Sequence, residues 1–325
     1  MKNILFITPE FFGIEKSLIK AMEAKGNTVT WFNERAITSS FAKAINSVNP
    51  HIFDSYSNRY YSRIIERNNR KFDQIIIVRG EMVTKKTLSA FRSKYPNAEL
   101  VLYLWDPVIN IKGILPRVKL YDRVISFEPK DCKKYGFEFR ALFCDLDKTP
   151  EVCINTDLDE YDVCFYGTMY RDRFHVVHLM KEFCKKNNKR FYTFCFLRGR
   201  FMGLYYCVTN KGYRELGSDA ISYIPKSSAE IAGIIEVSTI ILDINDPYQG
   251  GLTIRTLETL VSGKKMITTN PEIVNYDFYN SNNICVIGRD KIEVPNEFFE
   301  TKYEPVPGNI LRKYTAEGWV EDVIR

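Results

Sequence analysis

TIILDIN (residues 239–245) and PYQGGLTIRTLETLVSGKKMITTN (residues 247–270) together contain one complete βαβ pattern. TIILDIN is an apolar run of strand length, two glycines mark a turn, a stretch of helical spacing starts at Leu252, and KKMITTN is the next strand. Such a unit indicates a parallel sheet, with backbone N–H groups and the positive end of a helix dipole at its carboxyl edge. The stretch therefore predicts an α/β fold that binds an anionic ligand, above all a nucleotide, at this edge.

The same alternation of strands and helices continues through both halves of the 325-residue chain. Strand patterns rich in Ile, Val and Leu occur at 3–8, 27–33, 72–80, 98–107 and 121–129, then again at 160–168, 189–199 and 283–289. Helical patterns occur at 14–25, 84–95, 174–187 and 227–237. Strands separated by helices predict parallel sheets covered on both faces. We expect two such sheets in tandem, joined near residue 150.

Composition limits the class of protein. Hydrophobic residues make up 45% and charged residues 26%, as in soluble globular proteins. No apolar run approaches the ~20 residues of a membrane-spanning helix, and ILFITPEFF near the N-terminus contains Glu10, so we expect a first strand and a cytoplasmic location. Residues 1–150 carry 25 basic and 16 acidic residues, whereas the remainder carries 21 and 24. The basic half predicts an anionic partner, unless this charge serves solubility alone.

Three stretches carry a family resemblance: YDVCFYGTMYRDR (residues 161–173), PYQGGLTIRTLETLVSGKKMITTN, and YTAEGWVEDVI (residues 314–324). They resemble GT-B glycosyltransferases of bacterial lipopolysaccharide and capsule gene clusters, a group related to the CgeB-like spore proteins. The resemblance implies two tandem Rossmann-like parallel-sheet domains facing a cleft. It assigns acceptor binding to residues 1–150, nucleotide-sugar donor binding to residues 151–308, and a terminal helix that packs back toward the first domain to residues 309–325.

The activity implied by this resemblance is transfer of a sugar from a nucleotide sugar to a cell-surface glycan or lipid-linked acceptor. The alternative is a non-catalytic nucleotide- or sugar-binding protein of surface assembly on the same fold. An oxidoreductase with a dinucleotide site fits less well, because the turn TPEFFG (residues 8–13) lacks the G-x-G-x-x-G pattern.

Glu258 is the first candidate for donor binding. With a helix starting at Leu252, it lies six residues in, roughly 9 Å from a diphosphate at the helix start, and this distance suits a carboxylate that binds both ribose hydroxyls. The resemblance implies the same role. A solvated charge on the helix surface is the alternative.

The remaining donor candidates surround the expected diphosphate. Gly250 and Gly251 allow close approach of the backbone, Thr253 can donate a hydroxyl, and Arg255 can neutralise the leaving group. An ordinary loop and an exposed arginine are the alternatives. Three further candidates lie at the end of the strand at 160–168: Gly167 and Thr168 end it, and Arg173 follows it. Arg171 also follows, and one of these two arginines is expected to be a surface charge.

A catalytic base is needed if the reaction inverts the anomeric carbon, because the acceptor hydroxyl must lose a proton. Three acids at strand ends of the first half are candidates: Asp106, Glu81 and Glu10. Asp106 is preferred, since the adjacent Trp105 can stack on a sugar. A structural aspartate in a turn is the alternative.

No metal or other cofactor is expected. The eight cysteines form no C-x-x-C pair and only three histidines occur, so reduced core thiols are predicted. The triplets Asp145-Leu-Asp147 and Asp157-Leu-Asp159 match the metal-binding pattern of GT-A enzymes, but we interpret both as inter-domain linker.

The stretch FDSYSNRYYSRIIERNNR (residues 53–70) mixes aromatic residues with arginines at helical spacing. This mixture predicts either contact with a lipid-linked acceptor or the inner membrane surface, or a helix with one core face and one basic face. No pattern matches a nucleic-acid-binding module, so no nucleic-acid partner is expected.

Overall fold

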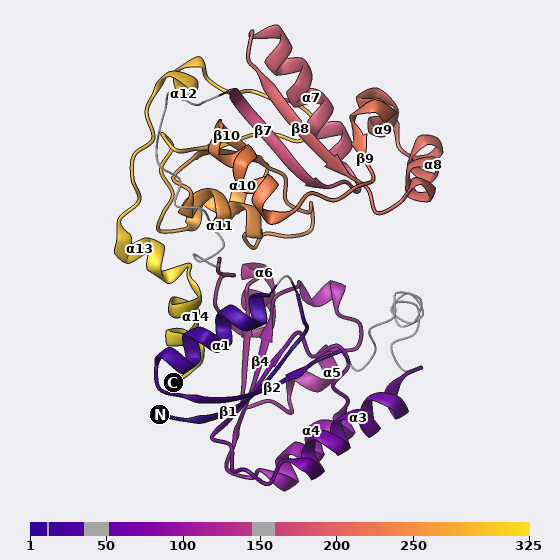
Figure 1. Cartoon of the computed structure of the whole chain (residues 1–325), viewed down its shortest axis with the longest axis vertical. Helices are drawn as coiled ribbons and strands as arrows, with labels where there is room; N and C mark the ends of the chain where they lie inside the picture. The colour runs from indigo at the N-terminus through magenta and orange to yellow at the C-terminus, as the bar shows by residue number, and fades with distance from the viewer. Residues whose placement is uncertain (12, 36–51, 145–159) are drawn as a thin grey trace. The chain divides into compact units, whose positions relative to one another are not determined.

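The computed structural model describes residues 1–11, 13–35, 52–144 and 160–325, which form two compact α/β units (Figure 1). Unit 1 comprises Met1–Phe143 and Thr315–Arg325, and unit 2 comprises Cys144–Tyr314. Each unit has one six-stranded sheet in which every recorded strand pair is parallel. The predicted α/β class with two tandem parallel sheets is therefore confirmed, while the expected junction near residue 150 lies outside the described residues.

Unit 1 has the strand order β2-β1-β3-β4-β5-β6. Its strands are β1 (Asn3–Thr8), β2 (Thr28–Asn33), β3 (Gln74–Val78), β4 (Glu99–Leu104), β5 (Arg123–Ser126) and β6 (Glu138–Phe139). Its helices are α1 (Ile14–Ala24), α3 (Asp54–Arg67), α4 (Lys85–Lys94), the 3₁₀ turn η1 (Val108–Asn110), α5 (Leu115–Val118), α6 (Pro129–Tyr135) and α14 (Ala316–Val323).

Both faces of the unit 1 sheet are covered, as the continuous apolar strands predict. Leu5 and Ile7 of β1 belong to the cluster beneath α3 and α4, whereas Ile4 and Phe6 belong to the cluster beneath α1 and α14. In α3, Tyr61, Ile64 and Ile65 pack into the first of these clusters and Tyr60 packs against it, whereas Tyr56 is exposed. This stretch is therefore a core helix with a basic outer face, as the second interpretation predicted.

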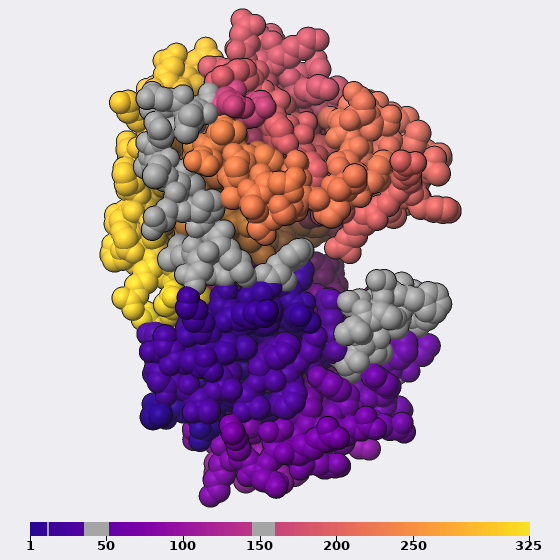
Figure 2. All heavy atoms as spheres, viewed as in Figure 1, coloured from indigo at the N-terminus to yellow at the C-terminus, as the bar shows by residue number. Residues whose placement is uncertain are grey.

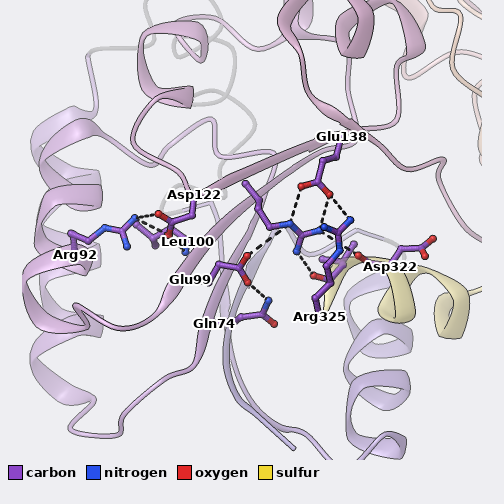
Figure 3. A network of polar contacts seen from close by, with 10 residues as sticks. Gln74, Arg92, Glu99, Leu100, Asp122, Glu138, Asp322 and Arg325 are labelled. Carbon is purple, nitrogen blue, oxygen red and sulfur yellow. Dashed lines mark hydrogen bonds and ion pairs between the residues drawn. The ribbon is translucent and has the colours of Figure 1, made fainter.

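The last residues of the chain are bound to unit 1. Trp319 of α14 is fully buried, and its ring centroid lies 5.1 Å from that of Tyr103 on β4. Arg123 donates to both carboxylate oxygens of Glu138, at 3.0 and 2.9 Å, and to the Val323 carbonyl oxygen at 2.9 Å. Arg325 donates to the same glutamate, so charged groups reinforce the apolar contact of α14 (Figure 3).

Unit 2 has the strand order β12-β11-β10-β7-β8-β9. Its strands are β7 (Tyr161–Thr168), β8 (Phe191–Phe196), β9 (Ile221–Ser222), β10 (Ser238–Asp243), β11 (Lys265–Thr268) and β12 (Ile284–Val286). Its α-helices are α7 (Arg173–Lys186), α8 (Arg200–Thr209), α9 (Lys211–Leu216), α10 (Ser228–Glu236), α11 (Ile254–Val261), α12 (Asn296–Glu300) and α13 (Gly308–Lys313), and η4 (Ser218–Ala220) and η5 (Pro271–Asn275) are 3₁₀ turns.

The core of unit 2 also has two sides. Val163 and Phe165 of β7 face the cluster that includes α7, α9 and α12, and Cys164 and Tyr166 face α10. All seven described cysteines are free thiols. The residues expected as one terminal segment, 309–325, are divided between the units, with α13 in unit 2 and α14 in unit 1.

Candidate functional site

Helix α11 begins two residues later than the sequence predicts. Thr253 is its N-cap, and its hydroxyl accepts a hydrogen bond from the Thr256 backbone N–H at 3.1 Å, while the Thr256 hydroxyl accepts one from the Thr253 N–H at 3.3 Å. The prediction that the helix starts at Leu252 was wrong, because this capping box fixes the helix start at Ile254. Glu258 therefore lies five residues after the cap, about 7.5 Å along the helix axis.

The cap is anchored to a buried carboxylate at the end of β10. Asp243 accepts hydrogen bonds from the hydroxyls of Thr253 at 2.8 Å, Thr256 at 2.9 Å and Thr268 at 3.2 Å. In this structure the Thr253 hydroxyl hydrogen is directed at Asp243, so the residue acts as a cap. Within the described ranges, the backbone N–H groups of Ile254 and Arg255 have no acceptor, which leaves two donors at the positive end of the helix.

The Gly250-Gly251 turn is buried and held by side-chain amides. Asn270 donates to the Gly250 carbonyl oxygen at 3.0 Å, and Gln249 donates to that of Gly251 at 3.0 Å. Neither glycine adopts the left-handed conformation. The two amide side chains, which the sequence analysis did not single out, therefore shape the loop before α11.

Arg255 lies directly under Gly167. A Cβ atom at Gly167 would stand 2.5 Å from the Arg255 Nη2, and the backbone there has φ 151°, so two constraints favour glycine. The guanidinium carbon lies 4.5 Å from the Tyr166 ring centroid and 5.3 Å from that of Phe165. Among the described residues this guanidinium has no ion-pair partner, and its Nε is buried without an acceptor. It is a partly desolvated cation that packs on two aromatic rings and forms no direct ion pair with a described residue.

Arg173 is a second cation at the same strand end, and it is buried. Its guanidinium donates to the carbonyl oxygens of Thr168 at 2.9 Å and Ile244 at 2.6 Å, and its Nε has no acceptor among the described residues. Burial lowers the pKa of this guanidinium, and the charge of Arg255 lowers it further. Arg171, by contrast, is exposed and forms an ion pair with Asp246 at 2.6 Å. Of the two arginines, Arg173 is the one that belongs to the sheet edge.

Glu258 faces the same group of side chains. The Tyr166 hydroxyl donates to its Oε2 at 3.2 Å. Burial raises the pKa of Glu258, while Arg255 and the Tyr166 hydrogen bond oppose that rise. The structure thus brings Gly167, Arg173, Arg255 and Glu258 to one edge of the unit 2 sheet. One buried and one half-buried cation, with two open backbone N–H groups, suit a ligand with two negative charges. An adjacent carboxylate suits a ligand that also carries hydroxyls.

In unit 1 the structure brings two of the three base candidates together. Arg79, after β3, forms ion pairs with Glu81 at 2.9 Å and with Asp106 at 2.6 Å. Arg79 adopts an unusual left-handed φ of 69°, which marks a constrained backbone. Burial raises the pKa of Asp106, and the nearby Arg79 opposes the rise. Glu10 is exposed, and no recorded contact joins it to this group within the described ranges.

Glu34 is a buried acid that the sequence analysis missed. It follows β2, its Oε1 accepts a hydrogen bond from the Met82 N–H at 2.7 Å, and its Oε2 is buried without a partner among the described residues. Burial raises its pKa to about 7, against the Met82 hydrogen bond and Arg79. Glu34 directly follows the strand predicted at 27–33. The same position at a strand end made Asp106 and Glu10 candidates for the base, so this signal could also have found Glu34.

A cavity of about 490 Å³ opens beside Glu81 in unit 1. Its lining includes Lys85 and Lys86 at the start of α4, together with Lys112 and Arg117. Arg117 is nearly buried, and its Nε donates to the Gly113 carbonyl oxygen at 2.9 Å. The four cations make this cavity basic, although Asp54 and Glu81 also line it.

No group of three or more His, Cys, Asp or Glu side chains suited to a metal occurs in the described part of the chain, and both D-x-D triplets lie outside it. The absence of a metal and of other cofactors stays a prediction. No helix of the described residues is both long and apolar enough to cross a membrane.

Comparison with solved structures places this architecture among known folds. The lipopolysaccharide outer core galactosyltransferase WaaB aligns over 99% of both chains with a TM-score of 0.56 at 12% identity. The chain has the GT-B fold. The Anabaena protein HepE bound to UDP and glucose aligns over 99% of this chain and 95% of its own, with a TM-score of 0.53 at 11% identity. A UDP-GlcNAc 2-epimerase from Methanocaldococcus jannaschii aligns over 98% and 99%, with a TM-score of 0.55 at 11% identity.

No protein-family model matches the sequence, and no curated protein matches it either. These comparisons agree with the GT-B part of the resemblance. The CgeB-like part stays a prediction. The structures with this fold include transferases and an epimerase, so the reaction has to be argued from the site.

Proposed function

We propose that this protein is a glycosyltransferase that binds a nucleotide sugar at the carboxyl edge of the unit 2 sheet. One observation carries the proposal: Arg255 is held under Gly167 and over Tyr166, with no ion-pair partner among the described residues. Keeping a cation partly buried without a direct ion pair is costly, and an anionic ligand offsets that cost. WaaB and HepE, which share the fold, are a galactosyltransferase and a UDP-binding protein.

The diphosphate of the donor would accept hydrogen bonds from the N–H groups of Ile254 and Arg255, after the turn at Gly250 and Gly251. Breaking the sugar–phosphate bond leaves negative charge on the departing nucleotide, and the Arg255 guanidinium would stabilise that charge. Arg173 would add a second positive charge through space, while its own hydrogen bonds fix the strand end at Thr168. Thr253 contributes by capping α11.

Glu258 would bind the ribose. Its carboxylate lies about 7.5 Å along α11 from the cap, within reach of a ribose that follows a diphosphate at the helix start. A carboxylate that accepts from both ribose hydroxyls distinguishes a ribonucleotide from its 2′-deoxy analogue.

Unit 1 would bind the acceptor and supply the base. For an inverting transfer, Asp106 would take the proton of the acceptor hydroxyl as that oxygen attacks the anomeric carbon. Glu81 shares Arg79 with it, and Glu10 remains a third candidate. The cations of the cavity beside Glu81 suit an acceptor that carries a phosphate or a carboxylate. A cell-surface glycan or a lipid-linked sugar fits this description.

A lipid-linked acceptor implies work at the cytoplasmic face of a membrane, and we include peripheral membrane contact in the proposal. No nucleic-acid partner is proposed. The nucleotide sugar is the substrate, and the reaction is proposed to need no resident cofactor.

The donor site is tested by calorimetric titration with UDP and with uridine, since HepE binds UDP. Arg255→Gln removes the cation from beneath Gly167. A charged hydrogen bond contributes about 1.5–3 kcal/mol, so UDP affinity should fall roughly tenfold to a hundredfold. Uridine affinity should stay unchanged because uridine carries no phosphate.

Arg171→Gln is the matched control, because it removes an exposed arginine of the same strand end that is paired with Asp246. Equal UDP affinity in wild type and the Arg255 variant would refute the assignment. If UDP does not bind to wild type, the same titration with GDP, dTDP and ADP decides whether any nucleoside diphosphate is a ligand.

A further inference from the structure

Helix α8 carries a stripe of apolar side chains that are exposed at the protein surface. Phe201, Leu204, Tyr205 and Val208 follow the spacing i, i+3, i+4, i+7, which places them on one helix face. Their exposed fractions are 88%, 69%, 57% and 81%. Single exposed apolar residues are ordinary on protein surfaces, but four on one face of one helix indicate a binding surface.

The opposite face fixes α8 to unit 2. A Cβ atom at Gly203 would lie 2.2 Å from the Tyr223 hydroxyl oxygen, so glycine allows the close approach of the helix. The ring of Tyr206 packs 4.9 Å from that of Phe174 on α7. Because Gly203 and Tyr206 face inward, the stripe is held outward. In Figure 1, α8 lies at the margin of unit 2, beyond α9 from the sheet, and Figure 2 shows this segment at the molecular surface.

The charge of this segment is one-sided. Residues 198–214 contain Arg198, Arg200, Lys211 and Arg214 and no acidic residue. Lys211 pairs with Glu215, and Arg214 donates to the carbonyl oxygens of Cys207 and Val208 at the helix end. Arg198 and Arg200 are exposed, with no partner recorded among the described residues. Both stand at the helix start, where the dipole disfavours positive charge, so helix stability does not explain them.

An apolar stripe beside two exposed arginines fits an anionic lipid surface. A second copy of the chain fits less well, since α8 is only about 15 Å long and a stable interface buries about 800 Å² on each partner. We propose that α8 lies in the headgroup region of an anionic membrane, with its stripe among the acyl chains and Arg198 and Arg200 on lipid phosphates. This inference rests on the proposed peripheral membrane contact and names its surface.

Vesicle flotation without donor or acceptor tests the inference independently of sugar transfer. Wild type should bind phosphatidylcholine vesicles that contain phosphatidylglycerol, and the Leu204→Ser/Val208→Ser double variant should bind them at least tenfold more weakly. Ile52→Ser/Ile109→Ser is the matched control, because it removes two exposed isoleucines of unit 1 and should bind like wild type. Circular dichroism checks that each variant is folded, as expected for changes at exposed positions.

The double variant Arg198→Gln/Arg200→Gln tests whether the two arginines bind lipid phosphates. Binding to the anionic vesicles should fall at least fivefold, because each basic residue near such a surface contributes about a factor of five. Binding to pure phosphatidylcholine should not change. Equal flotation of wild type and the stripe variant would overturn the inference. It would also be overturned if light scattering showed a wild-type dimer that the stripe variant loses while vesicle binding persists, since the stripe would then join two copies.

Discussion

The burial of Glu34 predicts how strongly the stability of the protein depends on pH. Replacing it with glutamine keeps the shape and an acceptor for the Met82 N–H, and removes the titratable proton. Burial raises the pKa of Glu34 from 4.5 to about 7 in the folded protein. A difference of about 2.5 pH units corresponds to roughly 3 kcal/mol, and the carboxyl is fully buried, so solvent screening does not reduce this figure.

The direction in which stability changes with pH follows from proton binding. Between pH 4.5 and about 7 the folded state holds a proton on Glu34 that the unfolded state has lost. The contribution of Glu34 to stability is therefore complete below pH 4.5 and is lost as the pH rises through about 7. Glu34→Gln should escape this loss, so its free energy of unfolding relative to wild type should increase by roughly 3 kcal/mol between those limits.

The assay is urea unfolding followed by tryptophan fluorescence from acidic to mildly alkaline pH. All three tryptophans, Trp31, Trp105 and Trp319, belong to unit 1, so the signal reports the unit that contains Glu34. Glu23→Gln, at an exposed position of α1, is the control and should follow the wild-type profile. Parallel pH profiles for wild type and Glu34→Gln would show that the Glu34 carboxyl is not held neutral by burial, and would refute the reasoning.

Three further predictions concern the proposed reaction. Gly167→Ala places a Cβ atom 2.5 Å from the Arg255 Nη2, so the nucleoside diphosphate dissociation constant should rise at least tenfold in calorimetric titration, whereas Gly233→Ala, with no atom within 4 Å of the new Cβ, should leave it unchanged. Glu258→Gln should reduce the preference for UDP over 2′-deoxy-UDP about tenfold, and an unchanged preference would exclude the ribose role. Asp106→Asn should lower kcat about a hundredfold or more with little change in donor KM, and near-normal turnover would move the base to another acid.

The fold could be predicted because the signals that determine it are local. Ile75, Ile76 and Ile77 of β3 form a short apolar run, and such a run becomes a strand buried on both faces wherever helices flank it. The start of α11 could not be placed, because Leu252 continues the apolar spacing. Thr253 fixes the helix start only because its hydroxyl accepts from the Thr256 N–H and donates to Asp243, which lies ten residues upstream.

The candidate site was predicted in part for the same reason. Glu258 and Asp106 could be selected as candidates because they lie in motifs whose geometry is local. The partners of these residues depend on which strands become neighbours: Tyr166 reaches Glu258 because β7 pairs with β10, and Arg79 reaches Asp106 because β3 pairs with β4. Helix α8 was missed because its outward stripe resembles a core face in sequence, and only the packing of Gly203 shows which face is inward.

The position of α14 in unit 1 has a consequence for biosynthesis. Unit 2 is an insertion in unit 1, since residues 144–314 separate Phe143 from Thr315. A ribosome therefore finishes unit 2 before it makes Trp319, and until then the Tyr103 side of the unit 1 sheet lacks its aromatic partner. We expect nascent chains that stop before α14 to contain a folded unit 2 and an incomplete unit 1. Unit 1, although most of it is synthesised first, would therefore be the unit more exposed to chaperones and proteases.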